Sequence, residues 1–99
     1  IASRLIDAEE FNWAKYIGKE LAKNKAPDQA YGIASRLIDV EEFNWAKYIG
    51  CELAENGTSS QAYELTHQLI EKLIENGASI QAYEIASRLI NVGEFLQAR

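Results

Sequence analysis

The sequence has 99 residues, of which 47% are hydrophobic and 25% charged, with a single proline, so it predicts one small folded domain rather than a disordered linker. Its net charge of −5 repels phosphate backbones and anionic lipid surfaces, which argues against nucleic acid and membrane partners. No apolar stretch reaches the roughly 20 residues that a membrane span needs, no leader is visible, and one cysteine cannot form an internal disulfide. These features indicate a soluble protein in a reducing compartment, and we expect it to be cytoplasmic.

One unit of about 32 residues recurs along the chain, as in tandem-repeat proteins. Residues 1–32 and 33–64 differ at only eight of 32 positions, and most of the changes fall in a stretch rich in turn-forming residues. Residues 65–84 resemble a shortened copy and residues 85–99 a truncated one. We therefore interpret residues 1–99 as a single repeat array.

Each complete unit predicts two helices. Apolar residues recur three and four positions apart over 29–39, which is typical of an amphipathic helix. The same spacing recurs over 43–55, and the acidic DVEEF segment, repeated as DAEEF and NVGEF, suits the start of that second helix. We expect helical hairpins at about 1–24 and 28–56. Five side chains are predicted to be buried: Ala34, Leu37, Phe43, Ala46 and Ile49.

The shortened copy predicts a single helix over 60–76, near 25 Å long at about 1.5 Å per residue. Such a helix can lie across its neighbours, so we expect it to close or kink the array, with another helix from about 79 to 91. Gly57 and Gly77 follow asparagines and suit left-handed helix ends. The predicted fold class is all-α: tandem helix-turn-helix repeats of about 32 residues forming a short α-solenoid, with the third repeat shortened into one long helix.

Residues 89–98, LINVGEFLQA, resemble the tetratricopeptide signature of a leucine, a turn glycine, an acidic residue, an aromatic and a small residue. The match falls on Leu89, Gly93, Glu94, Phe95 and Ala98. Glu9 and Glu41 stand where that family has its turn glycine. The resemblance implies stacked helical hairpins that bind proteins or peptides.

Polar residues recur on the face of the first helix that core packing does not need. Arg4, Arg36 and Arg88 occupy equivalent positions in the units. The candidate partner-binding residues are Arg4, Ser35, Arg36, His67, Gln68 and Arg88. Two interpretations stay open: a groove in which guanidinium groups bind the carboxylates of a partner, or ion pairing between units. The second would use the carboxylates of Asp7, Asp39 and Glu84.

No motif predicts catalysis, a cofactor or a metal. A lone histidine without a nearby cysteine is a poor metal site. Cys51 replaces Lys19 on a helix face that tolerates charge, so its burial is not required. Trp13 and Trp45 recur one unit apart, each with a tyrosine three residues on. We favour packing between units for them over a site that stacks bases or sugars.

These features predict a non-catalytic protein-interaction scaffold that presents a concave helical surface to a peptide or a partner helix and uses no cofactor. The alternative is a self-assembling or structural element, natural or engineered, whose units stack end to end. Exposed repeat ends would then join chains into a homo-oligomer.

Overall fold

The computed structural model describes residues 2–24, 26–56 and 60–97, and the side chains within 4–24, 26–56 and 60–91. Every regular element in these ranges is a helix and none is a strand, which confirms the all-α prediction. The six helices are α1 (Ala2–Asp7), α2 (Phe11–Lys23), α3 (Pro27–Asp39), α4 (Phe43–Glu55), α5 (Ser60–Glu75) and α6 (Ser79–Gln97).

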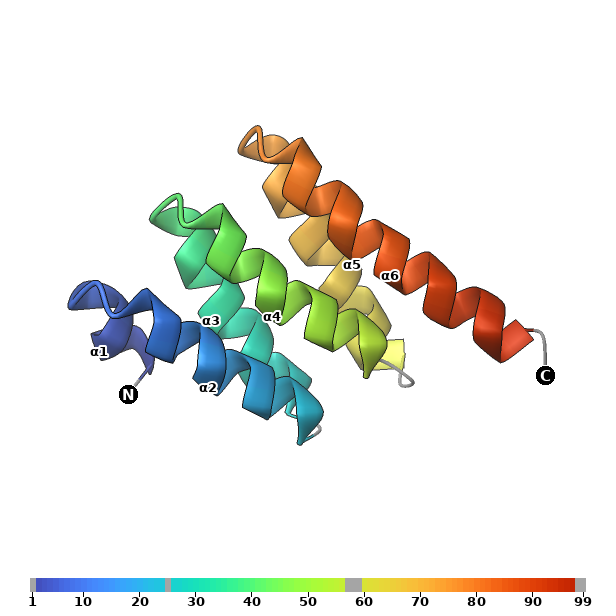
Figure 1. Cartoon of the computed structure of the whole chain (residues 1–99), viewed down its shortest axis with the longest axis horizontal. Helices are drawn as coiled ribbons and strands as arrows, with labels where there is room; N and C mark the ends of the chain where they lie inside the picture. The colour runs from blue at the N-terminus through green and yellow to red at the C-terminus, as the bar shows by residue number, and fades with distance from the viewer. Residues whose placement is uncertain (1, 25, 57–59, 98–99) are drawn as a thin grey trace.

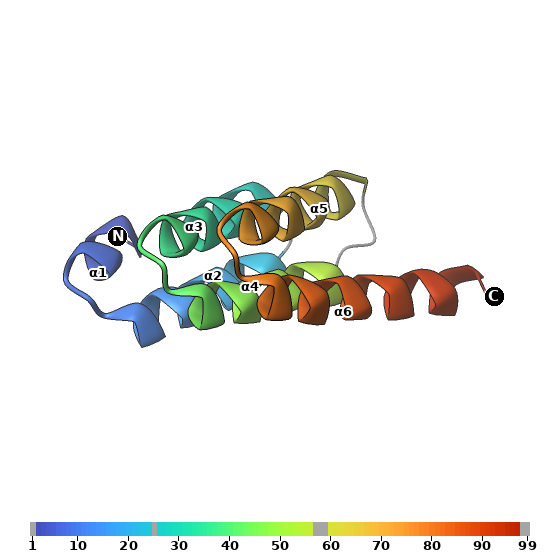
Figure 2. The ribbon, with the colours of Figure 1, turned by 90° about the horizontal axis from the view of Figure 1, so that it is seen from above.

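The helices form two layers (Figures 1 and 2). α1, α3 and α5 lie side by side in the first layer, and α2, α4 and α6 lie side by side in the second layer. Short turns join α1 to α2, α3 to α4 and α5 to α6, so the chain makes three consecutive helical hairpins. The molecule measures 44 × 29 × 17 Å, and its shortest dimension fits two layers of helices about 10 Å in diameter whose side chains interlock.

The third hairpin continues this arrangement, contrary to our expectation that a long helix would close or kink it. α5 lies beside α3 and α6 lies beside α4. α6 also runs unbroken through residues 91–94, where the NVGEF segment predicted a new helix start. After α3 the chain turns and α4 packs back against α3. In α6 the helix instead continues through residues 91–94, and its helical hydrogen bonds satisfy the backbone there.

Each of the three turns contains one residue with a left-handed backbone. The φ angle is 62° at Glu9, 63° at Glu41 and 80° at Gly77. This residue and the next one donate their N–H groups back to two carbonyl oxygens of the preceding helix, which is the Schellman pattern of helix ends. Gly77 therefore behaves as predicted, and Gly57 lies outside the described residues. Glycine adopts this conformation readily, but glutamate is strained in it.

The turn hydrogen bonds also define which residues are equivalent. Glu10, Glu42 and Ala78 donate their N–H groups to the carbonyls of equivalent leucines, Leu5, Leu37 and Leu73. Equivalent positions are therefore 32 residues apart between the first two hairpins and 36 apart between the second and the third. In consequence α6 is structurally equivalent to α4, although its sequence repeats that of α3.

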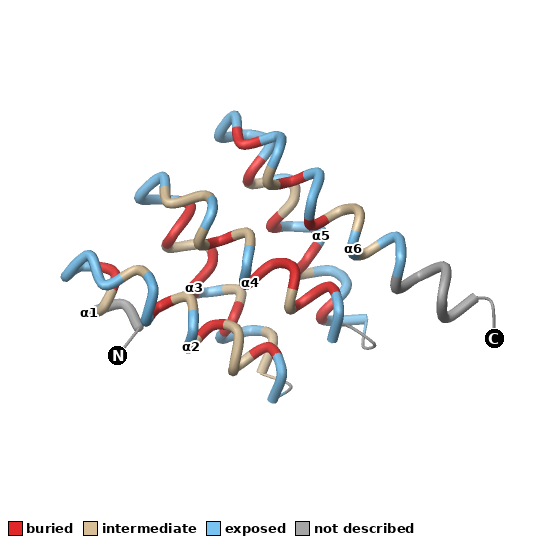
Figure 3. The backbone as a smooth tube through the Cα atoms, viewed as in Figure 1, coloured by how far each residue is buried: buried red, intermediate tan, exposed pale blue. Residues whose placement is uncertain are grey.

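Buried residues occur along helices of both layers, as the red parts of the backbone in Figure 3 show. The largest buried aliphatic side chains are Leu37, Ile38, Ile49, Leu53, Leu69, Leu73 and Ile85. Four of the five predicted core residues, Ala34, Leu37, Ala46 and Ile49, are buried as predicted. The prediction for Phe43 is wrong, because this side chain begins α4 at the edge of the core and is only partly buried.

Helices of the second layer approach each other where a glycine faces an isoleucine. A Cβ atom added to Gly18 would lie 2.5 Å from Cδ1 of Ile49. One added to Gly50 would lie closer still to Cδ1 of Ile85. The same contact therefore sets the approach of α4 to α2 and of α6 to α4.

Candidate functional site

The predicted partner-binding residues do not share one surface. Arg4 lies on α1, and Ser35 and Arg36 lie on α3. His67 and Gln68 lie on α5 in the same layer, but Arg88 lies on α6 in the other layer. Arg88 therefore lies in a different layer from Arg4 and Arg36, although the three arginines occupy equivalent positions in the sequence repeat.

Most of these cations already have carboxylate partners. Nη2 of Arg36 lies 3.0 Å from Oδ1 of Asp7 on the preceding hairpin. Arg88 pairs with Glu55, and this hydrogen bond raises the pKa of its guanidinium above the ordinary value. Arg4 is exposed and makes no ion pair with a described residue. Pairing between neighbouring helices thus occupies two of the three arginines.

Lys72, which sequence comparison missed, takes the place of Arg36 on α5. Its Nζ lies 2.9 Å from Oδ1 of Asp39 and donates a 2.5 Å hydrogen bond to Oγ of Ser35. Sequence alignment put Gln68 at this position. The four extra residues in the third hairpin move the equivalent position one helical turn further along α5.

His67 and Gln68 are exposed, and His67 is engaged with its own helix. Its Nδ1 lies 3.4 Å from Oε1 of Glu71 one turn later, a pairing absent from the sequence prediction. Its ring centroid is 6.3 Å from that of Tyr63. Within the described residues, no cluster of three histidine, cysteine or acidic side chains could hold a metal ion.

Cys51 is buried between α4 and α6, with 9% of its surface exposed, although the sequence did not require burial. Desolvation raises the pKa of its thiol, against smaller opposing effects of Arg88 and Lys47. The thiol is therefore protonated at neutral pH and is a poor nucleophile there. The pocket of about 200 Å³ beside it is lined largely by charged side chains that pair with one another.

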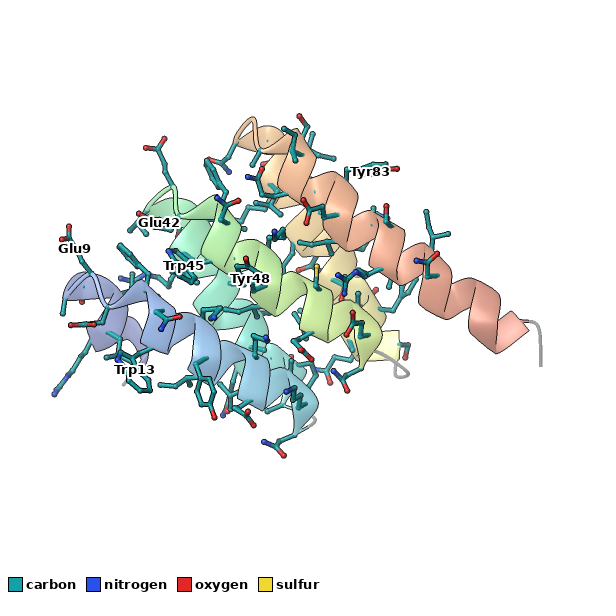
Figure 4. The ribbon with its side chains drawn as sticks, in the orientation of Figure 1. Glu9, Trp13, Glu42, Trp45, Tyr48 and Tyr83 are labelled. Atoms are coloured by element: carbon teal, nitrogen blue, oxygen red, sulfur yellow. The ribbon has the colours of Figure 1, made fainter. Side chains whose placement is uncertain are left out.

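Aromatic side chains gather instead on the outer surface of the second layer (Figure 4). Trp13 is 58% exposed and Tyr16 is 55% exposed, so neither fills the space between units as the favoured interpretation required. Trp45 packs against the core with one face, and Nζ of Lys15 lies 5.3 Å from its ring centroid. Figure 4 shows Trp45 between α2 and α4, with Tyr48 further along α4.

A surface pocket of about 480 Å³ opens beside these rings, within the roughly 300–1,000 Å³ usual for ligand sites. Its lining residues are Glu41, Glu42, Phe43, Asn44, Trp45, Lys47, Tyr48 and Gln81. Gln81 is at the position on α6 that is equivalent to that of Trp45 on α4. Its Nε2 donates a hydrogen bond of 2.9 Å to Oδ1 of Asn44. A glutamine is smaller than a tryptophan, so this position leaves more room beside α4 than a tryptophan would.

The two acidic side chains of the pocket have no cationic partner among the described residues. Lys47 lies over the ring of Tyr48 at 4.6 Å and pairs with Glu84 at 3.1 Å. Glu41 and Glu42 make no ion pair with any described residue. The sequence predicted for these two residues only a role at the positive end of the helix dipole. The one feature of the sequence that pointed to another role was that Glu41 stands where the tetratricopeptide signature has its turn glycine.

Comparisons with protein-family models, with curated proteins and with solved structures find no match for this chain. In the described part of the chain, no helix combines the length and the apolar character needed to cross a membrane. The fold and the pocket together define an all-α protein of three layered hairpins with an acidic, aromatic-lined surface pocket.

Proposed function

We propose that this chain is a non-catalytic protein-interaction module that holds a basic peptide segment on the outer surface of α4 and α6. The observation that carries the proposal is the pocket lined by Glu41 and Glu42, which make no ion pair with a described residue, together with Trp45 and Tyr48. A lysine or arginine side chain of a partner would meet both kinds of group there.

Cations favour such a site for two physical reasons. Carboxylates form charge-assisted hydrogen bonds with ammonium and guanidinium groups. Aromatic faces attract the same cations by about 0.5–1 kcal/mol at exposed sites. At Trp45 and Tyr48 a cation of the partner would compete with Lys15 and Lys47, which lie over these rings. The net charge of −5 adds long-range attraction for a basic partner.

We propose a basic partner in place of the acidic one that the recurring arginines of the sequence suggested. Arg36 and Arg88 are engaged with Asp7 and Glu55, and Arg88 lies in the other layer. Binding a carboxylate of a partner would first require these ion pairs to open.

We further propose that the three hairpins form a short tetratricopeptide-like α-solenoid. The nearly identical units of the sequence and the three equivalent Schellman turns support that assignment. Solenoids present extended surfaces to peptides, which suits a binding site on the outer surface of one layer.

Fluorescence anisotropy with two short labelled peptides of equal length, one rich in lysine and arginine and one rich in aspartate and glutamate, tests the proposal. The basic peptide should bind, with an affinity that falls as salt is raised, and the acidic peptide should not. Replacing both Glu41 and Glu42 by Gln should weaken binding about fivefold or more, since an exposed charge contact contributes about 0.5–1 kcal/mol.

The matched control replaces Glu9 and Glu10 by Gln at the equivalent turn of the first hairpin. It removes the same charge, but the position equivalent to Gln81 is there filled by Trp45. Equal weakening by both double variants would show that net charge alone attracts the peptide and would contradict the pocket. Preference for the acidic peptide would contradict the proposal outright.

A further inference from the structure

The two ends of the molecule both present uncovered apolar side chains. On α5 and α6 the exposed fractions are 56% at Ile74, 72% at Ile80 and 73% at Tyr83. Trp13 and Tyr16 are similarly exposed on α2. Figure 4 shows Trp13 on the edge of α2 that faces away from α4, and Tyr83 on the edge of α6 that faces away from α4.

The residues at the outer edge of the third hairpin can be compared with the equivalent residues of the second hairpin, which contact a neighbouring hairpin. Ile74 is equivalent to Ile38, which is fully buried where α5 covers α3. Ile80 and Tyr83 are equivalent to Asn44 and Lys47, the residues of α4 that contact α6 through Gln81 and Glu84. The outer edge of the third hairpin therefore has the positions of an internal contact between hairpins, and no described residue of the chain covers it.

A repeated ion pair also stops at the two ends. Arg36 on α3 reaches back to Asp7, and Lys72 on α5 reaches back to Asp39. By the turn hydrogen bonds, Arg4 is the preceding member of the cation series. The matching carboxylate that follows Asp7 and Asp39 is Glu75.

Arg4 and Glu75 are thus the two unmatched halves of one pair. Both are exposed, and neither makes an ion pair with a described residue. They lie at opposite ends of the row of hairpins, Arg4 on α1 and Glu75 at the end of α5. They have opposite charges, so one end of the molecule complements the other.

We propose that a second copy of this chain docks head to tail, with its α1 and α2 against α5 and α6 of the first. Arg4 of one copy pairs with Glu75 of the other, and Trp13 and Tyr16 pack on Ile80 and Tyr83. This contact joins different surfaces of the two copies, so it can add further copies instead of closing a dimer. It goes beyond the peptide site, from which it is separate.

One position makes the contact between copies weaker than those within the chain. Ile49 packs on Gly18 and Ile85 packs on Gly50. In the docked pair the equivalent isoleucine is Ile17, and it meets Ala86 where the internal contacts have glycine. The methyl group of Ala86 forces Ile17 to shift, so association should be weak and Ala86→Gly should strengthen it.

Sedimentation equilibrium of the chain over a concentration series tests the proposal, up to about 1 mM because small interfaces bind weakly. The wild type should self-associate at low salt. Arg4→Glu and Glu75→Arg should each lower the association constant about fivefold or more, and an equimolar mixture of the two variants should associate more tightly than either alone. Ala86→Gly should raise the association constant several-fold.

A second pair of variants tests the apolar part of the contact. Ile80→Lys should weaken association, whereas the matched control Val40→Lys, at an exposed turn position between α3 and α4, should not. Circular dichroism of each variant verifies the helical fold. A wild type that stays monomeric at the highest concentration, or an association that both charge reversals leave unchanged, would overturn the proposal. Neither result would bear on basic-peptide binding, which the Glu41 and Glu42 variants test separately.

Discussion

Glu9 and Glu41 have left-handed backbones, at a place where the third hairpin has Gly77. A side chain in this conformation costs about 1–2 kcal/mol relative to an ordinary one. At Glu41 the strained residue lines the pocket. Strained residues often mark functional sites, because the strain is kept for what the residue does.

Glu41→Gly should therefore raise the free energy of unfolding by about 0.5–1 kcal/mol, once the greater freedom of glycine in the unfolded chain is counted. The same variant should bind the basic peptide less tightly. Urea denaturation and anisotropy measure the two effects. Glu41→Gln is the control, which loses the charge but keeps the strain. A Glu41→Gly variant no more stable than Glu41→Gln would show that the turn is not strained.

Because of Cys51, the free energy of unfolding should change with pH in the alkaline range. Burial raises the pKa of its thiol in the folded chain, so the protonated thiol is favoured by folding. Its contribution to stability is fully present below the pKa of the unfolded chain, about 8.5, and is lost as pH rises through the higher folded value. In Cys51→Ala the free energy of unfolding should be lower near pH 7 but should fall less steeply above pH 9, as measured by urea denaturation at each pH. Parallel pH profiles for wild type and variant would contradict the burial.

At the scale of the elements, the sequence predicted the helices more successfully than their placement. The spacing of apolar residues predicted α3 and α4 to within about two residues at each end, which is the usual precision of helix boundaries. It could not assign α6 to a layer, because QAYEIASRLI occurs in it as QAYGIASRLI does in α3. The hairpin connection after α5, rather than the amphipathic pattern, decides the layer.

The pocket was missed for the same reason. Gln81 takes the position of Trp45 only in the register set by the four extra residues of the third hairpin. Sequence alignment instead matches Gln81 with Gln29. Residues that a register shift brings together cannot be read from a repeat alignment.

The close contact of α4 with α6 can be tested by filling it. Gly50→Ala should lower the free energy of unfolding by about 1 kcal/mol, because overpacking against Ile85 outweighs the roughly 1 kcal/mol gain in helix propensity. Adding Ile85→Val, which removes Cδ1, should restore part of the loss. Gly32→Ala is the matched control, since nothing lies within 4 Å of an added Cβ there, and it should stabilise α3. Stabilisation by Gly50→Ala equal to that by Gly32→Ala would contradict the packing.

At the scale of the whole molecule, the layered hairpins give it three separate surfaces. The two end surfaces complement each other, and the outer surface of the second layer carries the acidic pocket. Neither end surface includes Glu41 or Glu42, so self-association and peptide binding should respond to different substitutions.

The fluorescence of Trp45 tests the binding pocket most directly, because this side chain lines it. In Trp13→Phe, Trp45 is the remaining tryptophan. Titration with the lysine- and arginine-rich peptide should change its emission in a saturable manner. The change in emission should be strongly reduced when Glu41 and Glu42 are both glutamine, but kept when Glu9 and Glu10 are both glutamine. Gln81→Trp adds a second tryptophan, so for this variant binding is measured by the anisotropy of the labelled peptide, and binding should be lost. A peptide that binds without changing the emission of Trp45 would place the site elsewhere and contradict the proposed function.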